Sequence, residues 1–343
     1  MKRYISLLLC VGILLSAAGC STGAGSGAGG DSVIDGSGAV LVAPENPGAI
    51  KIASVYAVAV PFITALGLTG QVSAINVKSK FWTDADSALA GAGTVGRGTV
   101  DMEALASFAP GVLIHRSNDP ATVDAVAGKL GIPVLCITVE NYEDINYTLV
   151  MMGKYFGREE RAQQVCSWLS GKFEMISEIV DLIPPGERVR ALMMGGELGR
   201  IAGGEMIQSW MIEKAGGICT ASGIENNRNW ANVGEETIFE WNPDVIFATS
   251  STPLNYTVQA LMRDPAWSAM AAIKNQAVYI VPAGIDSWDM PGISSALGTM
   301  YMLHCMYPSY FSAEQLQSEI DEYYMFMFGK TFSSEYLGYD LAN

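Results

Sequence analysis

One long amphipathic segment, residues 158–183, constrains the fold of this chain more than any other feature. Its apolar side chains recur every three or four residues: Ala162, Val165, Trp168, Leu169, Phe173, Ile176, Ile179, Val180 and Ile183. This spacing places them on one face of an α-helix. Pro184-Pro185-Gly186 follows the segment and cannot continue a helix. At about 1.5 Å per residue the helix is roughly 35–40 Å long, the width of a small domain.

The stretches on either side of this helix each alternate short apolar strands with helices. The expected strands are residues 50–55, 71–77, 112–115 and 132–139 before it, and 189–194, 245–249 and 277–281 after it. Such alternation is typical of a largely parallel sheet covered by helices. We therefore predict an α/β fold with two Rossmann-like lobes, residues 47–157 and 186–343, joined by the linking helix at 158–185. The ligand cleft lies between the lobes, and closing helices end the second lobe.

A short unit occurs once in each half and supports this two-lobed organisation. Residues 100–114 match residues 233–247: a valine is followed three residues later by Glu103 or Glu236, then by a proline after seven more residues, and then by an apolar strand. Each copy is expected to form a short helix, a proline stop and a strand. Two such copies predict pseudo-symmetric lobes.

The beginning of the chain has the pattern of an export signal. Lys2 and Arg3 precede an apolar run at residues 4–15, and small residues then lead into Cys20. The run is too short to be a permanent membrane helix. Small residues before a cysteine resemble the bacterial lipobox, which implies that residues 1–19 are a signal peptide and that Cys20 is lipidated. The alternative is an ordinary cleaved signal with an incidental cysteine.

The segment that follows the predicted lipidation site is rich in Gly and Ser. We expect residues 20–46 to be a flexible tether, because such a composition has little to bury. The folded part is therefore expected outside the cytoplasm, held at the cell membrane by the lipid on Cys20.

Net charge and histidine content argue against three classes of partner. The formal net charge of −15 argues against nucleic acid and anionic lipid surfaces. Only His115 and His304 are present, whereas an importer of bare zinc or manganese needs several histidines and carboxylates. We expect no protein-built metal site and no cofactor.

The cysteines outside the export segment are Cys136, Cys166, Cys219 and Cys305. They lack CxxC or similar spacing, so we expect four buried free thiols rather than a disulfide framework.

Several segments, taken with their order and spacing, resemble the substrate-binding lipoproteins of bacterial ABC importers for iron complexes, cobalamin and haem. They are DMEALASFAPGVLI (101–114), LGIPV (130–134), GKYFGREERA (153–162), VGEETIFEWNPDVIF (233–247), DPAWSAMAAIKNQAVYIV (264–281) and residues 287–308. The resemblance implies two lobes that grip a ligand between them, a monomer, and a membrane permease as partner. It also implies that Glu103 and Glu236 dock on permease arginines. The alternative for each acid is that it only complements a helix N-terminus.

Candidate ligand-binding residues lie in the loops that follow the predicted strands. They are Tyr56, Lys80, Trp82, Arg97 and Arg116 in the first half, and Arg200, Arg228, Trp230, Trp288 and Asp289 in the second. Guanidinium groups match carboxylate or catecholate oxygens, and aromatic rings stack on flat ligands. The alternative for each is a solvated or packing residue. The cargo we expect is a metal chelate: a ferric siderophore first, a corrinoid second, and haem or an oxyanion after these.

An enzyme is the rival class, because two α/β lobes also build many enzymes. The glycine-rich residues 195–204 match neither GxGxxG nor GxxxxGK[ST]. No GxSxG elbow lies between a predicted strand and helix, and HExxH is missing. The sequence therefore favours a binding protein over a catalyst.

Overall fold

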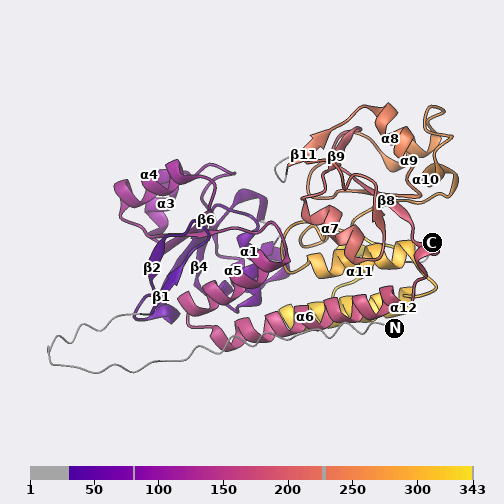
Figure 1. The fold of residues 1–343 in the computed structure, drawn as a ribbon. Helices are drawn as coiled ribbons and strands as arrows, with labels where there is room; N and C mark the ends of the chain where they lie inside the picture. The colour runs from indigo at the N-terminus through magenta and orange to yellow at the C-terminus, as the bar shows by residue number, and fades with distance from the viewer. Residues whose placement is uncertain (1–30, 80–81, 226–228, 342–343) are drawn as a thin grey trace, which may run out of the picture.

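The long helix lies where the sequence predicts it. The computed structural model describes residues 31–79, 82–225 and 229–341, and in it helix α6 (Glu159–Asp181) runs beneath two α/β lobes (Figure 1). The predicted apolar face is buried at Val165, Leu169 and Ile176 among others, and the helix ends before Pro184 as expected.

The N-terminal lobe is built on a five-stranded, fully parallel sheet with the order β5-β4-β3-β6-β7. Its strands are β3 (Ile52–Ser54), β4 (Val72–Ile75), β5 (Gly93–Thr94), β6 (Val112–Arg116) and β7 (Val134–Ile137). Its helices are α1 (Ala59–Ala65), α2 (Trp82–Ala85), α3 (Met102–Phe108), α4 (Pro120–Leu130) and α5 (Tyr142–Tyr155). All residues of β7 are apolar and buried, as expected for a parallel strand covered on both faces.

The C-terminal lobe has a six-stranded mixed sheet with the order β11-β9-β8-β12-β13, and β10 pairs with β8. Its strands are β8 (Arg190–Met194), β9 (Arg200–Ala202), β10 (Ile218–Cys219), β11 (Trp230–Asn232), β12 (Val245–Ala248) and β13 (Val278–Ile280). Its helices are α7 (Ile207–Lys214), α8 (Glu235–Trp241), α9 (Val258–Arg263), α10 (Ala271–Lys274), α11 (Ser295–Met306), α12 (Ala313–Phe328) and α13 (Ser334–Leu337). Strand β9 is antiparallel to both of its neighbours, β8 and β11, and the other pairings are parallel. The predicted pair of mostly parallel α/β lobes is confirmed.

The repeated unit forms matching structures in the two lobes. Helices α3 and α8 each end in a left-handed residue, Ala109 with φ 45° and Asn242 with φ 41°. In both copies a proline follows, and then a buried strand, β6 or β12. Figure 1 shows α3 and α8 on the same outer side of the two lobes. Glu103 and Glu236 are both exposed and lie in the first turns of these helices.

The segment predicted to be a flexible tether is part of the fold from Ser32 onward, which corrects that expectation. Strands β1 (Ser32–Ile34) and β2 (Val40–Val42) pair as an antiparallel hairpin. The Asp35 carboxylate accepts hydrogen bonds from the backbone N–H groups of Ala39 and Cys136, at 3.0 and 2.9 Å. The hairpin is therefore attached to the edge strand β7. Gly36, Ser37 and Gly38 form its turn, whereas residues 20–30 of the predicted tether lie outside the described residues.

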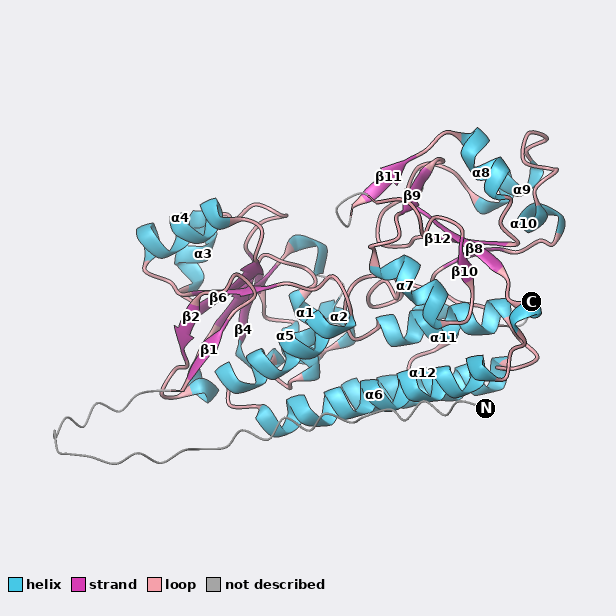
Figure 2. Ribbon diagram, in the orientation of Figure 1, coloured by secondary structure: helices cyan, strands magenta, loops and turns pink. Residues whose placement is uncertain are grey.

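A second helix lies alongside α6, where the sequence suggests a single linking helix. Helix α12 runs beside α6 in both ribbon views (Figures 1 and 2). Lys172 of α6 forms ion pairs with Glu319 and Glu322 of α12, at 2.6 and 2.8 Å. Arg161 donates hydrogen bonds to the carbonyl oxygens of Ala65 in the N-terminal lobe and Phe326 in α12, at 2.7 and 2.9 Å. The predicted closing helix thus also reinforces the connection between the lobes.

The four cysteines are free thiols, as predicted; Cys136 and Cys219 are buried, whereas Cys166 and Cys305 are only half-buried. Within the described residues, no helix combines the length and apolarity that a membrane crossing requires.

Candidate ligand-binding site

A cavity of about 660 Å³ lies between the two lobes. The N-terminal lobe contributes residues at the ends of β3, β4 and β6 and in the loop after β5, and the C-terminal lobe contributes the loops after β12 and β13. These are the carboxyl ends of parallel strands, where ligands bind in open α/β sheets. The predicted inter-lobe cleft is therefore present.

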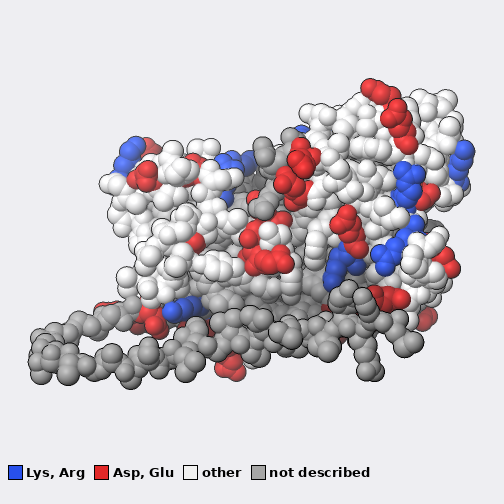
Figure 3. All heavy atoms as spheres, viewed as in Figure 1, with Lys and Arg blue, Asp and Glu red and all other residues white. Residues whose placement is uncertain are grey.

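The N-terminal wall of the cavity carries two arginines, Arg97 and Arg116. Arg97 is exposed in the turn between β5 and α3. That turn requires glycine at position 96. Gly96 has φ 113°, and a Cβ added there would overlap the carbonyl oxygen of Thr99. Arg116 ends β6, and 48% of its side chain is exposed. Figure 3 shows basic side chains on the part of this lobe that faces the other lobe.

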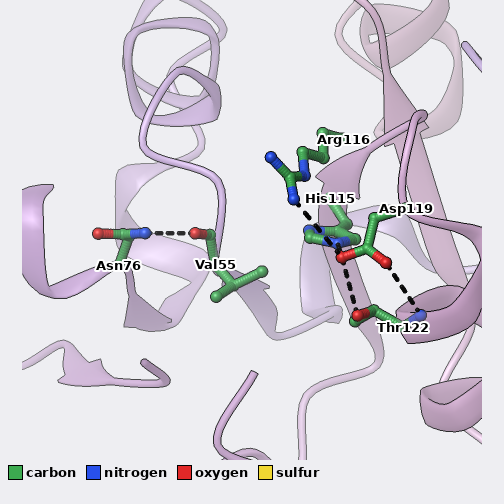
Figure 4. A network of polar contacts seen from close by, with 6 residues as sticks. All are labelled: Val55, Asn76, His115, Arg116, Asp119 and Thr122. Carbon is green, nitrogen blue, oxygen red and sulfur yellow. Dashed lines mark hydrogen bonds and ion pairs between the residues drawn. The ribbon is translucent and has the colours of Figure 1, made fainter. Parts of the chain in front are cut away.

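A partly buried network of polar contacts at the end of β6 holds Arg116 in place (Figure 4). The Asp119 carboxylate lies 3.2 Å from Nε2 of His115 and 3.8 Å from a guanidinium nitrogen of Arg116. Hydrogen bonding from Thr122 lowers the pKa of Asp119, and burial lowers the pKa of His115. Near neutral pH the network therefore consists of a carboxylate and a neutral imidazole, and Asp119 orients the arginine.

Tyr56 completes this wall as a hydrogen-bond donor. Burial and then the nearby Glu140 raise the pKa of the Tyr56 phenol to about 12, against the opposing effect of Arg116. The phenol is therefore protonated at neutral pH. Tyr56 and Arg116 also line a smaller adjoining cavity of about 420 Å³, so the two residues stand at the junction of two chambers.

The C-terminal wall offers hydroxyl groups that are arranged by a buried acid. Ser250, Ser251 and Ser287 line the cavity. Asp289 is fully buried behind them and accepts hydrogen bonds from the hydroxyls of Thr249, Ser287 and Ser250. Asp289, a predicted ligand-binding residue, is thus placed to position the serines rather than to line the cavity.

The predicted binding residues fall into five groups. Tyr56, Arg97 and Arg116 line the cavity. Trp82 and Trp288 lie in the core with exposures of 2% and 0%. The other members are Arg200 and Trp230 on the antiparallel strands β9 and β11, Asp289 behind the serines, and Lys80 and Arg228, which lie outside the described residues.

The structure adds cavity residues that sequence reasoning missed. Asn76, Ser250, Asp286 and Met290 line the cavity. Ser250 lies two residues after the apolar strand β12, and a polar residue just beyond the end of a buried strand is the signal that could have identified it. Asp286 and Met290 lie in the irregular segment after β13, where the sequence has no comparable signal.

Because Trp288 is a core residue, Trp288→Ala is expected to cost about 3–5 kcal/mol of unfolding free energy. Its ring contacts Tyr301 and Tyr339, and its indole N–H donates to the hydroxyl of Tyr324 at 3.1 Å. Chemical denaturation should show this loss, and Trp230→Ala at a half-buried position should cost less. A stable Trp288→Ala protein that loses only ligand binding would contradict this placement.

The comparisons with known proteins agree with this architecture. The sequence pattern of the periplasmic binding protein family matches residues 52–284. The molybdate-binding protein MolA of Haemophilus influenzae is 22% identical over 247 residues, which cover 66% of this chain and 69% of MolA.

Similar solved structures show the same two-lobed fold. A periplasmic solute binding protein from Veillonella parvula matches with a TM-score of 0.76 and 20% identity, covering 90% of this chain and 95% of that protein. MolA of Haemophilus influenzae bound to molybdate matches with a TM-score of 0.76 and 17% identity, covering 88% of this chain and 99% of MolA. CeuE of Helicobacter pylori with Ni(II) bound matches with a TM-score of 0.73 and 16% identity, covering 90% of this chain and 98% of CeuE. With the family match over most of the fold, the chain belongs to the periplasmic binding protein family, whose members are solute-binding proteins of ABC transporters and not enzymes.

Proposed function

We propose that this protein captures an anionic metal chelate outside the cytoplasm, with a ferric siderophore as first choice, and delivers it to the permease of an ABC importer. The observation that carries the proposal is the inter-lobe cavity, with Arg97, Arg116 and the phenol of Tyr56 on one wall and serine hydroxyls on the other. The arginines and the phenol donate hydrogen bonds, and the arginines also supply positive charge. Oxygen-rich anionic chelates match such a set.

The size of the cavity favours a chelate over a small oxyanion. Its volume of about 660 Å³ lies in the range of sites for drug-sized ligands. A tetrahedral oxyanion fills roughly 100 Å³, the share of three or four water molecules in the liquid. Molybdate is nevertheless the second candidate, because the curated relative MolA is a molybdate-binding protein.

The delivery step rests on the outer faces of the two lobes and on the export segment. We propose that Glu103 and Glu236 contact the permease, since both are exposed at matching places on α3 and α8. Figure 3 shows acidic side chains gathered over α8. Lipidation of Cys20, outside the described residues, would hold a monomer near that permease.

Calorimetric titration of the purified protein tests the proposed cargo. We expect ferric catecholate or hydroxamate siderophores to bind one to one with dissociation constants of about a micromolar or tighter. The metal-free siderophores, cobalamin, haem and molybdate are the comparison ligands. Binding of molybdate alone would replace the first candidate by the second, and binding of cobalamin or haem alone would exclude both.

A further inference from the structure

Among the residues that the structure describes, Asp286 is the only acid that lines the main cavity. It lies in the loop between β13 and α11, and only 7% of the residue is exposed. One carboxyl oxygen accepts a hydrogen bond from the hydroxyl of Ser294 at 2.6 Å. Among the described residues, Asp286 takes part in none of the ion pairs. A carboxylate buried in this way without a cation is energetically unfavourable.

The groups that α11 and α12 place around Asp286 carry no charge at neutral pH. Ser294, the N-cap residue of α11, presents its hydroxyl, and α12 presents the phenols of Tyr323 and Tyr324, whose pKa values are raised by burial. Across the cavity stand Tyr56, His115, Arg97 and Arg116 on the other lobe. Burial raises the pKa of Asp286 to about 7, with the Ser294 hydrogen bond opposing the shift.

We propose that Asp286 is a specificity-determining residue that donates a hydrogen bond from its protonated carboxyl group to an anionic oxygen of the cargo. This inference rests on the proposed function, an anionic cargo, and deepens it. A protonated carboxyl group has one donor, whereas a carboxylate only accepts hydrogen bonds. The ionised form would therefore repel the oxygen that the opposite arginines attract. Binding of an anion favours the protonated state.

The consequence is an affinity that depends on pH with a defined sign. Because the cargo binds the protonated form better, its affinity should fall as pH rises through about 7, by up to tenfold per pH unit. Asp286→Asn keeps an N–H donor at the same place but cannot ionise. The variant should therefore bind with little pH dependence of its own.

The experiment titrates the purified protein and Asp286→Asn with a ferric tris-catecholate complex at pH 6, 7, 8 and 8.5. The wild-type affinity should fall at least about tenfold more than that of the variant over this range. Any ionisation of the ligand affects both proteins equally and cancels in the comparison. If both proteins bind the complex with identical pH profiles, the proposed role of Asp286 is overturned, whereas the proposed function is not. Failure of both proteins to bind at every pH would overturn the proposed function and this inference with it.

Thermal unfolding without ligand gives a second readout. A group whose pKa is raised in the folded state stabilises the protein at low pH and loses that contribution as pH rises through the folded pKa. Asp286→Asn should therefore melt close to the wild type at pH 5 and at a higher temperature than the wild type at pH 8. A variant that melts lower by the same amount at both values would show that Asp286 is not neutral in the fold.

Discussion

Replacing Arg97 and Arg116 together with alanine is expected to weaken binding of the anionic chelate by about 100-fold or more. Both side chains line the N-terminal wall of the cavity, and among the described lining residues they are the permanent cations. A hydrogen bond to a charged group contributes about 1.5–3 kcal/mol, so two of them account for roughly 3–6 kcal/mol. Every 1.4 kcal/mol corresponds to about a factor of ten in the dissociation constant. Calorimetric titration measures the loss directly.

Two controls separate the cavity arginines from the general charge of the protein. Arg200→Ala removes an exposed arginine from β9, outside the cavity lining, and should leave the affinity within about twofold. Lysine at positions 97 and 116 keeps the charge but not the planar fork that matches paired oxygens, so it should restore only part of the affinity. A double alanine variant that binds like the wild type would exclude this wall as the anion site.

Reversing the charge of both Glu103 and Glu236 to arginine is expected to abolish uptake while leaving ligand affinity unchanged. The two acids are exposed on the outer side of separate lobes, away from the residues that line the cavity. Placing a cation in the first turn of a helix costs about 0.3–1 kcal/mol each, which a typical folded domain tolerates. Like charges facing permease arginines would instead prevent docking.

Uptake of a radiolabelled ferric chelate by cells, together with titration of the purified variant, measures the two properties separately. The matched control reverses Glu143 and Glu314, which are also exposed and also lie in the first turns of helices, α5 and α12. That control should transport normally. Normal uptake by the Glu103 and Glu236 variant would refute docking, and loss of its ligand binding would place these acids in the site.

Local sequence signals were sufficient to predict the helices whose ends they mark. Asp101 caps α3 by accepting a hydrogen bond from the backbone N–H of Ala104 at 2.9 Å. Pro110 follows the C-cap residue and prevents the helix from continuing. Helix α3 therefore begins after Asp101 and ends before Pro110. The apolar period of α6 likewise specifies a helix without knowledge of its partners.

Features that depend on contacts between residues far apart in the chain could not be predicted from the local sequence. The β1–β2 hairpin is held by Asp35, whose partner Cys136 is 101 residues away, so composition alone suggested a tether. The pairing of α12 with α6 depends on Lys172 and Glu319, which are equally remote in sequence.

The sequence identified part of the candidate site. Tyr56, Arg97 and Arg116 were selected in loops that follow predicted strands and line the cavity, whereas Arg200 from the same selection lies outside the lining. Trp82 and Trp288 follow strands in the same way, yet Trp82 stacks on Phe328 in the core, with ring centroids 5.7 Å apart. Whether a loop tryptophan faces a cavity or the core is decided by packing, which the local sequence does not contain.

Hydrogen–deuterium exchange with and without a ferric siderophore tests most directly whether cargo is held between the lobes. The account predicts protection on both walls at once, in residues 55–58 and 97–98 of one lobe and in residues 250–253 and 283–290 of the other. Exchange along α6 should change little, because both lobes already pack on it. Protection confined to one lobe, or to the outer surface near α3 and α8, would contradict binding in the inter-lobe cavity.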